Sequence, residues 1–316
     1  MSRLSGIQIQ KDQVVVNKGK MDMEKRTNIE RASSTAGYTC FSRACATREK
    51  DERFRGPDQM AELFLPGFAK IILNVPVLRK AFMGKVAPSG IYEYVLARTR
   101  LLDEIFLDGL TEKISQTVLL GAGMDTRALR FATKNQGTKI IELDIEKTQH
   151  PKIEILARKH VMLPEELVFA TIDFNKENIS DVLMKAGYQR GRYNLFLWEG
   201  VTMYLNAEAV DGTLAFIKAS SKKGSRVVFD YILASVLRRE NRFYGEKEIF
   251  DTVSRAGEGW TFGIEEGAIG EYLNERGLRM ISHYTPAELE ERYFRNEDGS
   301  VDRRINGTHC IVLAEV

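Results

Sequence analysis

Short apolar runs alternate with longer amphipathic stretches from about residue 111 to the end of the chain. Each run has the length of a strand and is apolar at successive positions, which is typical of strands buried on both faces. The stretches between them carry apolar residues at helix spacing. Such strands, separated by helices, predict a mainly parallel sheet with right-handed crossovers and helices on both faces. The seven strand candidates lie in the segments 114–123, 138–145, 167–174, 193–200, 222–233, 268–285 and 307–316.

The chain before this region has a different pattern. Residues 26–110 show helix spacing and no strand alternation, and Pro66, Pro76 and Pro88 divide them into segments. In the last segment Tyr94, Leu101, Leu102 and Ile105 share one helix face. We therefore expect three parts, which are a flexible or loosely docked polar arm, a helical cap that covers the substrate, and an α/β core with a helical insert at about 235–275. Their expected bounds are 1–25, 26–110 and 111–316.

Composition and charge narrow the class of protein. Hydrophobic residues make up 43% and charged residues 28% of the chain, as in ordinary globular proteins. The 46 basic residues nearly balance the 44 acidic ones, which argues against dedicated binding of nucleic acids. The three cysteines form no disulfide framework, and no Cys/His cluster indicates a metal. No apolar run suits a signal peptide or a membrane helix, so we expect a cytoplasmic protein without membrane contact.

The stretch "TVLLGAGMDTRALRF" (residues 117–131) ends the first predicted strand in a glycine turn. Gly121 and Gly123 can adopt positive φ and let a ligand approach the backbone, and a helix start beyond them favours an anion. Asp144 ends the second strand 21 residues after Gly123, where a carboxylate can accept hydrogen bonds from ribose hydroxyls. The pattern predicts an adenosine-containing ligand. The alternative is a turn without a ligand, followed by acids that cap helices.

Three further strand and helix positions point to the same edge of the sheet. Asp173 and Phe174 end the third strand, where an acid can accept from an adenine amino group and an aromatic ring can flank it. Glu199 directly follows the buried run "LFLW" and suits a cationic amine of a ligand. Arg98 precedes the glycine turn and can hold a carboxylate through two hydrogen bonds. The alternatives are that Asp173 caps a helix, that Glu199 has a structural role and that Arg98 is a solvated surface residue.

Together the stretches "VLLGAGMDTRALRF", "IIELDI", "TIDF" and "LFLWEGVTMYL" resemble the leucine carboxyl methyltransferase family, which includes bacterial polyketide-type O-methyltransferases. The resemblance implies a class I methyltransferase fold, with a Rossmann-like, seven-stranded sheet, and S-adenosylmethionine as the cofactor. It places Gly121 and Gly123 beside the methionine part, Arg98 on its carboxylate and Glu199 near its amine. It also places Asp144 on the ribose and Asp173 with Phe174 on the adenine. Ser34, Thr35 and Arg43 are candidate acceptor contacts.

These inferences predict an S-adenosylmethionine-dependent O-methyltransferase whose product is S-adenosylhomocysteine. A small molecule, such as a polyketide-type metabolite, is favoured over a protein as the acceptor, because residues 1–30 and 235–265 do not align with the family. A carboxylate acceptor is ionised at neutral pH, whereas a phenol usually needs a base. No histidine lies in the matched motifs, so we expect catalysis by positioning and desolvation, which favours a carboxylate and leaves a hydroxyl open.

Two other functions remain open at this point. The first is an NAD-dependent oxidoreductase, although the dinucleotide fingerprint needs a small residue where this chain has Thr126. The second is a non-catalytic protein that binds an adenosine ligand on the same fold. The presence of every matched ligand position, from Arg98 to Glu199, argues against such a loss of function.

Overall fold

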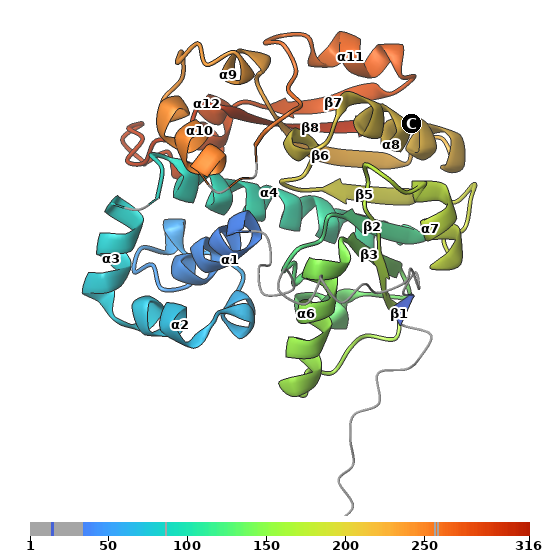
Figure 1. The fold of residues 1–316 in the computed structure, drawn as a ribbon, viewed down its shortest axis with the longest axis horizontal. Coiled ribbons are helices and arrows are strands. Elements are labelled where there is room, and N and C mark those ends of the chain that lie inside the picture. The colour runs from blue at the N-terminus through green and yellow to red at the C-terminus, as the bar shows by residue number, and fades with distance from the viewer. Residues whose placement is uncertain (1–13, 16–33, 86, 256, 258) are drawn as a thin grey trace, which may run out of the picture.

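The structure, a computed structural model, describes residues 14–15, 34–85, 87–255, 257 and 259–316. Within them one sheet of eight strands has the order β1-β4-β3-β2-β5-β6-β8-β7 (Figure 1). The strands are β1 (Val14–Val15), β2 (Gln116–Leu120), β3 (Lys139–Asp144), β4 (Leu167–Thr171), β5 (Asn194–Trp198), β6 (Arg226–Ile232), β7 (Arg279–Tyr284) and β8 (His309–Glu315). Only β8 runs antiparallel to its neighbours. The seven predicted strands, β2 to β8, and the α/β class I methyltransferase fold are confirmed.

The strand order reverses beside β2, which pairs with β3 on one side and with β5 on the other. The carboxyl ends of these three parallel strands therefore meet at the topological switch point, where open α/β sheets bind ligands. Gly121, Asp144 and Glu199 each follow or end one of these strands. The predicted positions are thus brought to one edge by the topology and not by closeness in sequence.

Both faces of the sheet are covered, as the continuous apolar runs predict. In β2 the side chain of Leu119 packs in one core cluster with α4 and α6, whereas Val118 and Leu120 pack in a second cluster with α7 and α8. This alternation follows from the two-residue period of a strand. The core helices are α5 (Arg127–Arg130), α6 (Glu146–Arg158), α7 (Ile179–Lys185), α8 (Ala207–Ser220), α9 (Ala234–Leu237), α10 (Glu246–Arg255), α11 (Ile269–Glu275) and α12 (Pro286–Phe294).

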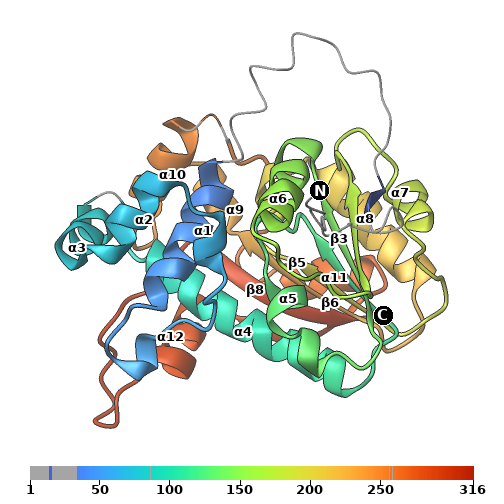
Figure 2. The same cartoon turned by 90° about the horizontal axis from the view of Figure 1, so that it is seen from below.

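The described part of residues 26–110 is helical throughout and contains α1 (Ser34–Ala46), α2 (Gly67–Asn74), α3 (Pro76–Lys85) and α4 (Ile91–Thr111). Figure 2 shows α1, α2 and α3 grouped on one side of the molecule, with α4 running from them to the sheet. The helix α4 contacts both α1 and β5, and most of its residues are buried. It therefore joins the cap to the core and carries Arg98 to the switch point.

Two elements were not predicted from the sequence. The strand β1 pairs in parallel with β4 inside the range assigned to a loose arm, and the rest of that arm lies outside the described residues. The helix α12 follows β7 and begins with a capping box between Thr285 and Glu288, with Pro286 at its first position. Both features are sequence signals for a helix start, so α12 was readable from the chain.

Several absences hold for the described part of the chain. None of its helices combines the length and the apolar character needed to cross a membrane. It contains no group of three or more His, Cys, Asp or Glu side chains that could hold a metal ion. The three cysteines are buried and unpaired.

Candidate functional site

The glycine turn after β2 adopts the backbone conformation that the sequence predicted. The φ angles are 69° at Gly121 and 50° at Gly123, in the region that L side chains avoid. A Cβ at Gly121 would lie 2.2 Å from Cγ2 of Val201, so the following loop also excludes a side chain there. A Cβ at Gly123 would meet only Ala36, at 3.8 Å. Gly121 is thus required by packing, whereas Gly123 leaves open space above the turn.

Asp144 is held against this turn. Its Oδ2 accepts a hydrogen bond from the Gly123 N–H at 2.5 Å, and its Oδ1 accepts one from the Ile145 N–H at 2.7 Å. Burial raises the pKa of Asp144, and the backbone N–H groups of Gly123 and Ile145 oppose that shift. The structure therefore brings the ends of β2 and β3 together through a buried carboxylate, which is the arrangement a ribose contact requires.

Asp173 and Phe174 follow β4 at the same edge. The Asp173 carboxylate accepts from the Asn175 N–H at 3.2 Å and pairs with Nζ of Lys176 at 2.6 Å, which are local turn contacts. The Phe174 ring lies 6.5 Å from that of Trp198, the last residue of β5. The Trp198 Nε1–H is buried and has no hydrogen-bond partner among the described residues. The adenine contact of Asp173 and Phe174 stays a prediction.

Arg98 and Glu199 form the centre of a buried ion-pair cluster. The Nε of Arg98 lies 3.0 Å from Oε1 of Glu199, and its Nη1 lies 2.6 Å from Oδ2 of Asp230 in β6. Asp230 also accepts hydrogen bonds from the Tyr94 hydroxyl at 2.9 Å and from the Gly200 N–H at 2.6 Å. Arg98 is therefore not a solvated side chain, because it joins α4 to the ends of two strands.

Arg127 extends this cluster on the other side of Glu199. Its Nη1 lies 2.8 Å from Oε2 of Glu199 and also bonds Asp125, while its Nε lies 2.8 Å from Oδ1 of Asp103. Burial would raise the pKa of Glu199, but the positive charges of Arg127, Arg98 and Arg43 outweigh it and lower that pKa to about 2. Glu199 is consequently ionised at every pH at which the protein is expected to work.

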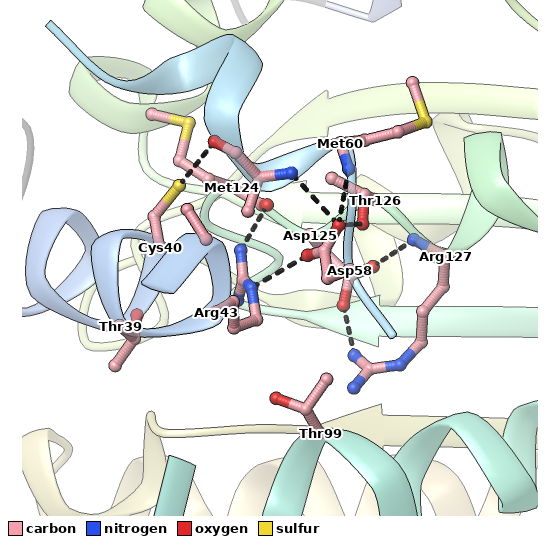
Figure 3. Close-up of polar contacts among 12 residues, drawn as sticks. Thr39, Cys40, Arg43, Asp58, Met60, Thr99, Met124, Asp125, Thr126 and Arg127 are labelled. Atoms are coloured by element: carbon pink, nitrogen blue, oxygen red, sulfur yellow. Dashed lines mark hydrogen bonds and ion pairs between the residues drawn. The ribbon is translucent and has the colours of Figure 1, made fainter. Parts of the chain in front are cut away.

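Arg43 ties the cap to the glycine turn. Figure 3 shows this side chain extending from α1 toward the loop of Met124 and Asp125. Its Nη2 donates to the Met124 carbonyl at 2.6 Å, and its Nε lies 2.9 Å from Oδ2 of Asp58. Asp58 in turn accepts from the Thr126 hydroxyl at 2.8 Å. Arg43, a candidate acceptor contact, thus also positions the turn.

The other two candidate acceptor residues lie at the start of α1. Thr35 Oγ1 accepts a hydrogen bond of 3.4 Å from the Tyr204 hydroxyl. The side chain of Ser34 lies outside the described residues. Tyr204 packs with Tyr38 and Trp260 on a small core cluster formed by α4 and α10. The structure therefore joins Thr35 of the cap to Tyr204, which follows β5 in the core.

A protein-family model matches the part of the chain that holds most of this site, whereas Thr35, Asp230 and His309 lie outside the matched residues. A family model described as leucine carboxyl methyltransferase matches residues 36–218, which is more than half of the chain. The chain belongs to the leucine carboxyl methyltransferase family. The matched part contains the cap helices, the glycine turn and the ends of β2, β3, β4 and β5. The resemblance inferred from the motifs is confirmed.

Similar proteins with curated names carry the same designation, S-adenosyl-L-methionine-dependent methyltransferase. YktD of Bacillus subtilis is 24% identical over 201 residues, which cover 64% of this chain and 66% of YktD. A relative from Mycobacterium tuberculosis (strain H37Ra) is 30% identical over 215 residues, or 65% of this chain and 67% of that protein. A relative from Streptomyces coelicolor is matched over 46% of its length. The match thus spans two thirds or less of these relatives.

Solved structures show only a distant likeness. Magnesium protoporphyrin IX methyltransferase of Synechocystis PCC 6803, solved with S-adenosylhomocysteine bound, is 11% identical over 80% of this chain and 90% of that chain, with a TM-score of 0.44. A likeness of this size supports no argument about the site. The geometry of the family member described here therefore has to be interpreted from its own residues.

Several charged residues of the cluster were missed at the level of sequence. Asp230 lies within the strand run "VVFDYI", where a buried acid needs a partner. Asp125 and Arg127 stand directly after the glycine turn, in the string "GMDTR" that carried the resemblance. Asp125 and Arg127 pair locally, but the other partners, Arg98 and Asp103 of α4 and Glu199 after β5, lie far away in sequence, so no local spacing links them to the cluster. The sequence shows that these acids are present, but only the folded structure shows which residues they pair with.

His309, the first residue of β8, also lies near the cluster. Its ring stacks 4.6 Å from that of Tyr94 and meets the ring of Trp260 edge-on at 5.3 Å. Burial and the charge of Arg98 lower the pKa of His309 to about 3, so the imidazole is neutral. No histidine lies in the matched motifs, but the antiparallel direction of β8 brings this one to the edge where the parallel strands end.

The hydrogen bonds around His309 define its tautomer. The Thr308 hydroxyl donates its proton to Oδ1 of Asn306 at 2.5 Å. The Thr308 oxygen lies 2.7 Å from Nδ1 of His309 and can therefore only accept, which places the imidazole proton on Nδ1. Nε2 then carries a lone pair, so His309 can accept a hydrogen bond from a hydroxyl group.

Proposed function

We propose that this chain is an S-adenosylmethionine-dependent O-methyltransferase with a small-molecule acceptor. The proposal rests mainly on the placement of Asp144 at the end of β3 and Glu199 after β5, on either side of β2 and its glycine turn. The carboxylate of Asp144 suits the ribose of the cofactor, and the carboxylate of Glu199 suits its ammonium group. Membership of the leucine carboxyl methyltransferase family supports the same cofactor and reaction class.

The charge of the site favours this cofactor over NAD. Carboxylates outnumber arginines in the cluster, since Asp58, Asp103, Asp125, Glu199 and Asp230 face Arg43, Arg98, Arg127 and Arg130. Asp144 adds another acid at the turn. S-adenosylmethionine carries a sulfonium, an ammonium and a carboxylate and is net positive, whereas the pyrophosphate of NAD is negative. An edge rich in carboxylates stabilises bound S-adenosylmethionine and repels the pyrophosphate of NAD.

The residues of the site fit the cofactor. Gly123 leaves space above the turn, and the unpartnered Trp198 N–H offers a donor at the end of β5. Bound S-adenosylmethionine supplies an electrophilic methyl group. Arg98 would share its guanidinium with the carboxylate of the methionine part, and Glu199 would hold the amine. The helices α1 and α4 exclude water, which favours a reaction in which charge is lost.

The acceptor supplies an oxygen nucleophile, from either a carboxylate or a hydroxyl. His309 favours a hydroxyl, because its Nε2 lone pair can accept a hydrogen bond that a carboxylate cannot donate. The nearby rings of Tyr94 and Trp260 suit a planar, apolar acceptor. A hydroxyl acceptor would donate a hydrogen bond to Nε2 and release its proton to water as the oxygen attacks the methyl carbon and the carbon–sulfur bond breaks with its electron pair on sulfur, because an imidazole with a pKa of about 3 is too weak a base to keep the proton.

Calorimetric titration with S-adenosylhomocysteine tests the cofactor assignment. We expect micromolar binding, no heat with NAD, and transfer of labelled methyl groups to a panel of phenols and aromatic carboxylic acids. Ligand at 100 times its dissociation constant should also stabilise the fold by about 2.7 kcal/mol. Binding of NAD but not of S-adenosylhomocysteine would replace the proposal with an oxidoreductase. Binding without methyl transfer to any acceptor would favour a non-catalytic protein.

A further inference from the structure

A surface far from the candidate site is unusually apolar. The helices α2 and α3 expose Phe68, Ile71, Val75, Val77 and Leu78 within eleven consecutive residues. The exposed fractions are 69% for Phe68, 62% for Ile71 and 76% for Val77. Isolated exposed apolar residues are ordinary, but a contiguous group of this kind marks a contact surface. In Figure 1 these helices lie at the lower left, away from α7 and α8.

The same surface is positively charged. The segment 67–85 contains Lys70, Arg79, Lys80 and Lys85 and no acidic residue. No ion pair joins Lys70 or Lys80 to an acid among the described residues. Apolar residues interleaved with unneutralised cations are typical of helices that lie in the interface of an anionic membrane.

A pocket beside α2 continues this pattern. Phe64, Leu65 and Ile155 line it with apolar side chains, and Lys70, Arg158 and Lys159 line it with cations. No carboxylate lines the pocket. The acids next to it along the chain, Glu62 and Glu154, pair with Arg48 at 2.6 Å and with His150 at 3.1 Å. Met162, three residues beyond Lys159, is 86% exposed.

We propose that the α2–α3 surface, defined by Phe68, Ile71, Val77, Lys70 and Lys80, docks on an anionic lipid membrane. The apolar side chains enter the boundary between head groups and acyl chains, and the pocket of Lys70, Arg158 and Lys159 receives a lipid phosphate. The cap then faces the bilayer, from which an apolar acceptor can be drawn. This docking needs no membrane-spanning helix and differs from the expectation of no membrane contact.

The charge decides between a membrane and a second copy of the chain. Two copies that met through this surface would bring Lys70 and Lys80 of one against those of the other, and like charges at an interface oppose association. An anionic bilayer instead attracts each lysine or arginine near it. The apolar face alone would fit either a membrane or a second copy of the chain, so the positive charges decide in favour of the membrane.

Co-sedimentation of the purified protein with vesicles tests the docking. We expect binding to vesicles of phosphatidylglycerol and phosphatidylcholine, little binding to pure phosphatidylcholine, and release by high salt. The triple variant Lys70→Glu/Arg158→Glu/Lys159→Glu should weaken binding about a hundredfold or more, since each reversed charge loses its attraction. Phe68→Ser/Ile71→Ser should reduce binding to both kinds of vesicle.

Matched variants on the far side of the molecule control for charge and surface apolarity. Lys185→Glu/Lys222→Glu/Lys223→Glu changes the same number of charges, and Met184→Ser removes an exposed apolar side chain of α7. Both should bind vesicles like the unmodified chain. Equal binding to neutral and anionic vesicles, loss of binding in the control triple variant, or a dimer in light scattering that Phe68→Ser/Ile71→Ser dissociates would each overturn the proposal.

Discussion

The carboxylate of Asp144 accepts a hydrogen bond from the backbone N–H of Gly123, with 2.5 Å between Oδ2 and N. Gly123 lies in the turn that follows β2 and Asp144 is the last residue of β3, so this bond joins the glycine turn to the end of the neighbouring strand. The acid is thereby oriented before any ligand binds. Preorganisation of this kind lowers the cost of binding, because fewer groups must be ordered.

Replacing this acid should weaken binding of the cofactor product. Asp144→Ala removes the acceptor for the ribose hydroxyls and releases the Gly123 N–H, which should cost roughly 1–3 kcal/mol of affinity for S-adenosylhomocysteine. Calorimetry on the folded variant measures this, and Asp181→Ala, an exposed acid of α7, is the control. Unchanged affinity in Asp144→Ala would remove Asp144 from the site.

A methyl group at Gly121 should destabilise the fold through Val201. Gly121→Ala introduces a Cβ 2.2 Å from Cγ2 of Val201, at a φ of 69°. Gly191→Ala has a similar φ of 71° and nothing within 4 Å, so it isolates the backbone strain, about 1–2 kcal/mol. Urea unfolding should show a larger loss for Gly121→Ala, partly recovered in Gly121→Ala/Val201→Ala. Equal losses in the two single variants would contradict the packing role of Val201.

Removal of Arg127 should cost far more stability than removal of a surface arginine. Arg127→Ala leaves Asp125 buried without an ion-pair partner and leaves Asp103 and Glu199 with one arginine each, which should cost about 3–5 kcal/mol of unfolding free energy. Arg48→Ala breaks a pair with Glu62 whose members are 39% and 34% exposed, and should cost about 0–1 kcal/mol. Comparable losses would mean that the cluster around Glu199 contributes little.

Glu199 should make stability depend on pH in the acid range. Its folded pKa of about 2 lies below the ordinary value of 4.5, so its ionic contribution is complete above 4.5 and is lost as pH falls through 2. The difference in unfolding temperature between the unmodified chain and Glu199→Gln should therefore shrink between pH 4.5 and pH 2. It should be constant from pH 5 to pH 8. A difference independent of pH below 4.5 would show that the Glu199 charge is not stabilised in the fold.

His309 should affect turnover and not cofactor binding. His309→Phe removes the Nε2 lone pair that can orient a hydroxyl acceptor through a hydrogen bond, so methylation of that acceptor should fall about 10-fold while affinity for S-adenosylhomocysteine is unchanged. His283→Phe in β7 is the control, since that ring bonds Tyr231 at 2.9 Å. The methylated product should be a base-stable ether. A base-labile ester, formed equally well by His309→Phe, would assign the acceptor as a carboxylate.

Much of the fold was readable because its signals are local. Buried strands are continuous apolar runs, and the helices between them have their own period, so β2 to β8 followed from the chain alone. The capping box at Thr285 was an equally local signal for α12. The strand β1 was not readable, because two residues are too few to show the alternating pattern of a strand. They form a strand only because they pair with the open edge of β4.

The sequence by itself determined the kinds of side chain at the strand ends, namely two glycines, Asp144, Asp173 and Glu199, because residues that follow a strand are set by chain order. The tertiary structure alone decided their partners. Arg98 meets Glu199 and Asp230 across more than a hundred positions of sequence, and His309 reaches the site only because β8 runs antiparallel. Ion pairs and hydrogen bonds depend on distance in space, which a linear pattern does not contain.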